Sequence, residues 1–116
     1  MTDDILDRLT DLAQGNESYA VFNQRIVNTK MPVIGVRVPD LRRLARELAP
    51  GMSAADISEL LTAQNESFDY VLLCGLLITH ARFDDQTMID LAKQYLPHVD
   101  SWAHIDVFVE KKRRFA

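Results

Sequence analysis

An indole and a carboxylate lie four residues apart near the end of this 116-residue chain, in the stretch SWAHIDVF. Side chains at positions i and i+4 share one face of a helix, so Trp102 and Asp106 are predicted to line one wall of a cleft. Asp106 also lies between the apolar residues Ile105 and Val107, and an acid set among apolar groups is a candidate for a functional site. Trp102 is the only tryptophan of the chain.

Each of these residues also has a purely structural interpretation. A tryptophan at the start of an amphipathic helix commonly packs in the core or at its rim, and Asp106 is alternatively an exposed acid. His104 is predicted to lie on a different helix face from Asp106 and to be exposed to solvent. We expect no metal site, because His80 and His98 are scattered and the chain has no paired cysteines.

Four arginines form a second candidate site. Residues 21–50 contain six basic and two acidic residues, a local charge of +4 in a chain whose net charge is −4. The local field governs binding to phosphate more than the net charge does. Arg37, Arg42, Arg43 and Arg46 are therefore predicted to contact phosphate groups, such as those of a nucleic-acid backbone, with a solvated helix face as the equally open alternative.

Length and composition indicate one soluble globular domain. Apolar residues make up 47% and charged residues 26% of the chain, which is ordinary for such a protein. The acidic start and the lack of an 18-residue apolar run favour neither a signal peptide nor a membrane span, so we expect a cytoplasmic protein. The single cysteine, Cys74, lies in an apolar run and is predicted to be a buried structural residue.

Apolar spacing predicts an all-α fold with seven helices. A structured loop at residues 29–39 interrupts them, because it is rich in proline and glycine. The helix at residues 67–81 is apolar on nearly every side and is expected to be the central one. Its Gly75 predicts the close approach of a neighbouring helix. The last four helices form two hairpins offset by about thirty residues, a spacing typical of a helical repeat stack.

The same spacing predicts individual helix starts and buried positions. Ser53 with Asp56 forms a variant capping box, Asp84 caps the sixth helix, and Asp100 or Ser101 caps the seventh. The sixth helix is expected to bury Leu96 together with its other apolar residues. The predicted core contains Leu44, Phe68, Leu72, Leu76, Leu91 and Phe108.

Two short motifs resemble the DNA alkylation repair (AlkD-like) family. Residues 33–45, VIGVRVPDLRRLA, are similar to its signature G-[VI]-x-x-P-x-x-R-x-L, and residues 101–106 are similar to its W-x-x-x-D motif. The resemblance covers essentially the whole chain. It implies a stack of HEAT-like helical pairs that grips duplex DNA, and a DNA glycosylase that excises cationic N3- or N7-alkylated purines without a metal or cofactor.

The resemblance also assigns roles to Trp102 and Asp106. Asp106 would stabilise the positive charge that develops on the deoxyribose as the glycosidic bond breaks, and would orient the attacking water. Trp102 would attract the cationic base or sugar through its ring face. Because an alkylated purine is already a good leaving group, no general acid is needed.

The chain departs from the family in length. Family enzymes have further repeats that supply a second tryptophan and an arginine, and they often have threonine where Val38 stands. Residues 1–116 are therefore expected to form a single HEAT-like domain that is the N-terminal part of a longer family fold, with weak or no excision alone. A stack cut in this way would self-associate through its exposed end. The alternatives are a non-catalytic helical-repeat module that binds DNA and a protein-interaction scaffold.

Overall fold

The computed structural model describes residues 2–63 and 67–107, and every regular element within these ranges is helical. The α-helices are α1 (Thr2–Leu12), α2 (Glu17–Val27), α3 (Val38–Leu48), α4 (Ala54–Thr62), α5 (Phe68–His80) and α6 (Asp85–Tyr95). Two short 3-10 turns, η1 (Ala49–Gly51) and η2 (Leu96–His98), follow α3 and α6. A seventh helix begins at Trp102 and is described as far as Val107; we call these residues the Trp102 helix. The predicted all-α class is confirmed for the described residues.

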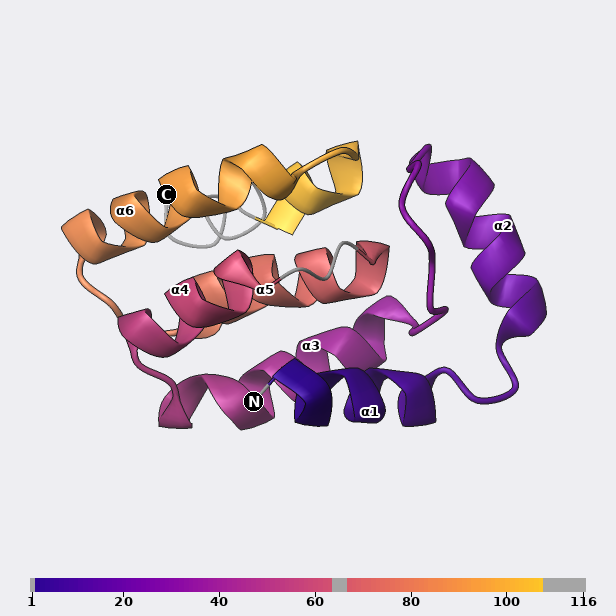
Figure 1. The fold of residues 1–116 in the computed structure, drawn as a ribbon, viewed down its shortest axis with the longest axis horizontal. Helices are drawn as coiled ribbons and strands as arrows, with labels where there is room; N and C mark the ends of the chain where they lie inside the picture. Colours follow the sequence, from indigo (N-terminus) through magenta and orange to yellow (C-terminus); the bar gives the residue numbers. More distant parts are fainter. Residues whose placement is uncertain (1, 64–66, 108–116) are drawn as a thin grey trace.

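Helix α5 occupies the centre of the molecule, as predicted. It lies between α1 and α3 on one side and α6 on the other, and it also packs against α4 (Figure 1). All of its residues from Phe68 to Thr79 are buried, including Cys74. The predicted core residues Leu44, Phe68, Leu72, Leu76 and Leu91 are buried, whereas Phe108 lies outside the described residues.

Local signals in the sequence account for the starts of three helices. Ser53 and Asp56 form a complete capping box at α4, because each side chain accepts a hydrogen bond from the other residue's backbone N–H. Ser67 caps α5 by accepting from the Tyr70 N–H, and Asp84 caps α6 by accepting from the Thr87 N–H. These side chains satisfy donors that have no partner within their own helices.

The close helix approach predicted at Gly75 is made by α6. A Cβ atom at Gly75 would lie 2.6 Å from the Tyr95 hydroxyl oxygen and 2.8 Å from its ring carbon Cζ. Only a residue without a side chain leaves room for this buried ring. Glycine at the middle of α5 therefore allows α6 to pack closely, which offsets its poor helix propensity.

One apolar expectation is wrong, and helix α2 leaves part of its apolar face uncovered. Helix α2 forms where its spacing predicts, but it lies at one end of the molecule and runs across the direction of the other helices (Figure 1). Consequently Phe22 and Ile26 are 62% and 54% exposed. The expectation that Leu96 is buried is wrong: its side chain is 53% exposed, because α6 ends at Tyr95 and the 3-10 turn η2 begins at Leu96 itself. No helix within the described ranges is long and apolar enough to cross a membrane.

Candidate functional site: the Trp102 helix and its supports

The two residues singled out for chemistry lie on the outer face of the Trp102 helix. Trp102 is 55% exposed and Asp106 is also exposed. Their i, i+4 spacing within one helix places both side chains on the same face. Val107 and His104 are buried on the inner side of the same helix. The structure therefore presents an indole and a carboxylate together to solvent from a helix that is anchored from behind.

His104 is not exposed, and the prediction for this residue is wrong. Its side chain is fully buried, and its ring lies 4.8 Å from the Phe68 ring, centroid to centroid. His104 does lie on a different face from Asp106, but the face of Asp106 is the solvent-facing one, so the opposite face points into the core. The spacing of residues along a helix predicts which side chains share a face, but it does not predict which face packs against the rest of the protein.

The hydrogen bonds of His104 define its tautomer and its charge. Nε2 lies 3.2 Å from the Phe68 carbonyl oxygen, which can only accept, so Nε2 carries the proton. Nδ1 accepts from the backbone N–H of Asp100 at 3.4 Å. Burial lowers the pKa of His104, against the raising effects of the Phe68 carbonyl and of the nearby Asp100 and Asp69 carboxylates. The neutral imidazole thus joins the Trp102 helix to the start of α5.

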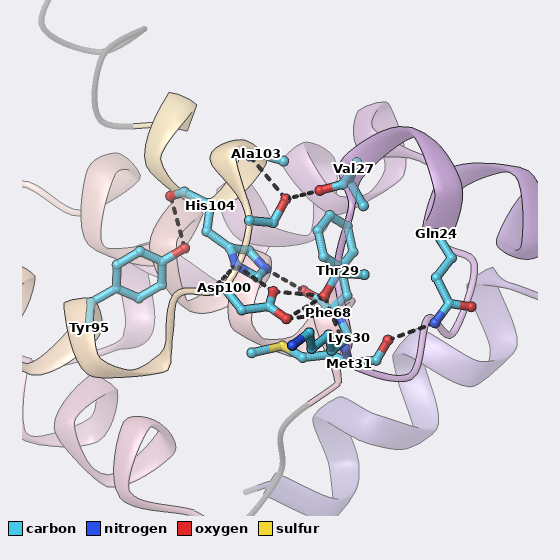
Figure 2. Close-up of polar contacts among 11 residues, drawn as sticks. Gln24, Val27, Thr29, Lys30, Met31, Phe68, Tyr95, Asp100, Ala103 and His104 are labelled. Atoms are coloured by element: carbon cyan, nitrogen blue, oxygen red, sulfur yellow. Dashed lines mark hydrogen bonds and ion pairs between the residues drawn. The ribbon is translucent and has the colours of Figure 1, made fainter.

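Three further hydrogen bonds fix the first turn of this helix (Figure 2). Ser101 donates its hydroxyl proton to the Val27 carbonyl at the end of α2, at 2.6 Å, and accepts from the Ala103 N–H at 3.3 Å. On the other side, the Tyr95 hydroxyl donates to the His104 carbonyl at 3.0 Å. Burial raises the pKa of Tyr95, so its hydroxyl remains a donor. Of the two predicted caps, Ser101 caps the helix.

Asp100 has a different task, which sequence reasoning missed. Its carboxylate accepts two contacts from the Thr29 hydroxyl, at 2.7 and 2.9 Å, and one from the Lys30 backbone N–H at 2.9 Å. Thr29 is buried, and its hydroxyl oxygen also accepts from the Met31 N–H at 3.1 Å. Figure 2 shows the resulting chain of contacts from His104 through Asp100 to the segment between α2 and α3.

The predicted DNA-contacting arginines lie on α3 and immediately before it. Arg37 is exposed and stacks over the Tyr19 ring, with its guanidinium carbon 4.4 Å from the ring centroid. Arg43 is exposed and pairs with Asp40 at 3.0 Å. Arg42 is half-buried and Arg46 is exposed. The structure places these four in one stretch of surface helix and loop, and it does not bring them into contact with Trp102 or Asp106.

A buried acid that sequence reasoning also missed holds the loop before Arg37. Asp69 is fully buried, and its carboxylate accepts from the backbone N–H groups of Ile34, Gly35 and Val36 at 2.6, 3.2 and 2.9 Å. Burial raises the pKa of Asp69, while these three hydrogen bonds oppose the shift. Its signal in the sequence is a carboxylate inside the apolar run SFDYVLL, since an acid in such a run requires compensating donors.

The loop itself depends on Gly35. This residue has a φ of 105°, which favours glycine. An added Cβ atom would also lie 3.0 Å from the Cβ atom of Ala20 on α2. The Gly35 carbonyl accepts from the Asn16 side chain at 3.0 Å. The glycine of the motif at residues 33–45 therefore lets the loop turn between α2 and α5 toward α3.

Within residues 2–63 and 67–107, no group of three His, Cys, Asp or Glu side chains is placed to hold a metal ion. A surface hollow of about 530 Å³ contains neither Trp102 nor Asp106. It is lined by Ala49, Pro50, Met52, His80, Ala81, Arg82 and Phe83.

Comparison with models of protein families gives a match. The model of the family described as DNA alkylation repair enzyme matches residues 7–112, which is nearly the whole chain. No curated protein and no solved structure matches. The matched region includes the loop held by Asp69, helix α3 and the Trp102 helix with its supports. The chain therefore belongs to the DNA alkylation repair enzyme family.

Proposed function

We propose that this chain recognises cationic N3- or N7-alkylated purines in duplex DNA and supports their excision by a glycosylase reaction at the Trp102 helix. One observation carries the proposal. Trp102 and Asp106 are both exposed on one helix face, in a chain that belongs to a DNA alkylation repair family. The buried contacts of His104 and Ser101 support that face from behind.

The chemistry of an alkylated purine suits these two side chains. Alkylation at N3 or N7 gives the base a positive charge, so it leaves without being protonated first. Positive charge then develops on the deoxyribose, where a nearby carboxylate lowers the barrier. In the proposed mechanism Asp106 supplies that negative charge and orients the attacking water. The Trp102 ring face attracts the cationic base or sugar, a contribution of about 0.5–2 kcal/mol.

The arginines would hold the DNA backbone. Both acids within residues 21–50 are engaged in ion pairs, Asp40 with Arg43 and Glu47 with Arg8 of α1. Exposed Arg37 and Arg46 add to the local positive charge beside these pairs. Contacts of this kind position DNA without reading its sequence, which fits a protein that searches for chemical damage.

The architecture proposed for this function is a HEAT-like stack. Helix α4 packs against α5, and α6 packs against both of them. The Trp102 helix follows α6 and hydrogen-bonds to it through Tyr95. These contacts support two successive helical pairs, α4 with α5 and α6 with the Trp102 helix, which would present Trp102 toward DNA.

Binding to matched duplexes tests recognition. One duplex contains a single 7-methylguanine, and the other contains guanine at the same position. A cation–π contribution of 0.5–2 kcal/mol corresponds to a preference of about 2- to 30-fold for the methylated duplex. Trp102→Ala should remove most of this preference and leave the binding to unmodified DNA nearly unchanged.

The exposed leucine Leu96 offers a matched control, since Leu96→Ala removes an apolar side chain that is 53% exposed and lies outside the Trp102 face. This variant should retain the preference. Equal affinity of the wild-type chain for both duplexes would contradict recognition by Trp102, and affinity that does not depend on salt would contradict DNA binding through phosphates.

A further inference from the structure

We propose that Asp100 is a positioning residue, which couples the segment between α2 and α3 to the helix that carries Trp102 and Asp106. Its carboxylate accepts hydrogen bonds from the Thr29 hydroxyl and from the Lys30 backbone N–H. We call these three residues the Asp100 bridge. Thr29 and Asp100 are 71 residues apart in the sequence, so the bridge is a tertiary contact and no local turn requires it.

The bridge acts directly on the start of the Trp102 helix. Asp100 lies two residues before Trp102, and its backbone N–H donates to the buried ring of His104. A shift of Asp100 would therefore disturb both the entry to the helix and the histidine that anchors its inner side. Ser101, the next residue, is held separately by the Val27 carbonyl. The first turn is thus fixed to the end of α2 and to the segment that follows it.

The same segment leads to the proposed DNA-contacting arginines. Asp100 holds it at Thr29 and Lys30, and Asp69 holds it at Ile34, Gly35 and Val36. Arg37 follows immediately. Asp100 and Asp69 therefore fix the two ends of residues 29–36, and this segment connects Arg37 to the start of the Trp102 helix. Its consequence for DNA rests on the proposed function: a backbone contact at Arg37 would be linked to the placement of Trp102 and Asp106.

The hydrogen bond from the Thr29 hydroxyl to Asp100 is partly buried. Thr29 is 7% exposed, so water cannot readily replace its hydroxyl. The Asp100 side chain is 28% exposed and the His104 ring is fully buried. Replacing Thr29 with valine keeps the side-chain shape while removing both the donor to Asp100 and the acceptor for Met31. Serine at this position keeps the hydroxyl.

The coupling is tested without DNA by time-resolved fluorescence anisotropy, because Trp102 is the only tryptophan. Asp100→Asn and Thr29→Val should increase the amplitude of the fast local motion of Trp102, whereas Thr29→Ser should restore the wild-type decay. Glu47→Gln serves as a control, since it removes an ion pair between α1 and α3. Circular dichroism under the same conditions confirms that each variant is folded. An unchanged decay in both Asp100→Asn and Thr29→Val would overturn the proposal.

Release of 7-methylguanine from duplex DNA saturated with protein then tests positioning. Misplacement of a reacting group by about 1 Å costs up to about 10²-fold in rate. We expect Thr29→Val to lower the release rate by at least about tenfold with little change in DNA affinity, and Thr29→Ser to rescue it. A mobile Trp102 with an unchanged release rate would overturn the positioning role. Because residues 1–116 alone are expected to excise weakly, release is measured with protein in excess of DNA. If the wild-type chain still releases no base, the excision proposed for this chain is contradicted, and the anisotropy result alone decides the coupling.

Discussion

Substitution of Gly75 by alanine tests the packing of α5 against α6, on which the Trp102 helix depends. The new methyl group would lie 2.6 Å from the Tyr95 hydroxyl oxygen and 2.8 Å from Cζ, both shorter than real contacts of a Cβ atom. Tyr95 is fully buried, so its ring cannot simply swing into solvent. The ring or the helix must move, and the hydrogen bond from Tyr95 to the His104 carbonyl is then lost.

The expected magnitude follows from three contributions. Alanine gains about 1 kcal/mol of helix propensity over glycine. Overpacking of a buried site costs about 1–3 kcal/mol, and loss of the Tyr95 hydrogen bond costs about another 1 kcal/mol. We therefore expect Gly75→Ala to lower the free energy of unfolding by about 1–3 kcal/mol.

Urea denaturation of matched variants measures this effect. Gly51→Ala is the control, since an added Cβ atom there meets nothing within 4 Å, and it should be nearly neutral. Tyr95→Phe removes the closer of the two conflicting atoms, so Gly75→Ala should cost less in that background than in the wild type. If Gly75→Ala is as harmless as Gly51→Ala, the described contact between α5 and Tyr95 is wrong.

Three further predictions concern the supports of the site and its charge. Asp69→Ala leaves three N–H groups, two of them buried, without their acceptor and should lower the free energy of unfolding by about 2–5 kcal/mol in urea titrations; a loss below about 0.5 kcal/mol would argue against the anchoring of the loop. Burial lowers the pKa of His104 below its unfolded value of 6.5, so the unfolded chain binds more protons than the folded chain as the pH falls through 6.5. The free energy of unfolding should therefore be greatest above pH 6.5 and decrease as the pH falls toward the folded pKa. His104→Gln should reduce this dependence of stability on pH. Replacing Arg42 and Arg46 together should weaken duplex binding and flatten its salt dependence by about one unit per lost contact, and unchanged affinity would assign both arginines to a solvated face.

Local signals made much of the fold predictable from the sequence. The capping side chains act within four residues of the helix starts that they define, so their effect does not depend on the rest of the molecule. They are Ser53 with Asp56 at α4, Ser67 at α5 and Asp84 at α6. The apolar character of residues 67–81 likewise determines that this helix must be surrounded. Gly75 was informative for the same reason, since a glycine inside a helix needs a close neighbour.

The features that the sequence did not predict, or predicted wrongly, all depend on tertiary contacts. Asp100 and Thr29 are far apart in the sequence, and nothing near either residue indicates the other. His104 was placed on the correct helix face with the wrong exposure, because the covering atoms come from α5. The same limit applies to α2, whose helical spacing is regular although Phe22 on its outer face is 62% exposed.

The central claim is that Asp106 provides the negative charge for base excision, and the rate of 7-methylguanine release from duplex DNA tests it most directly. Asp106→Asn keeps the size of the side chain and should lower the single-turnover rate by about 10²–10³, with DNA binding retained. Asp90→Asn is the matched control, an exposed acid on α6, and should release the base at the wild-type rate. Release by Asp106→Asn at the wild-type rate would contradict the account.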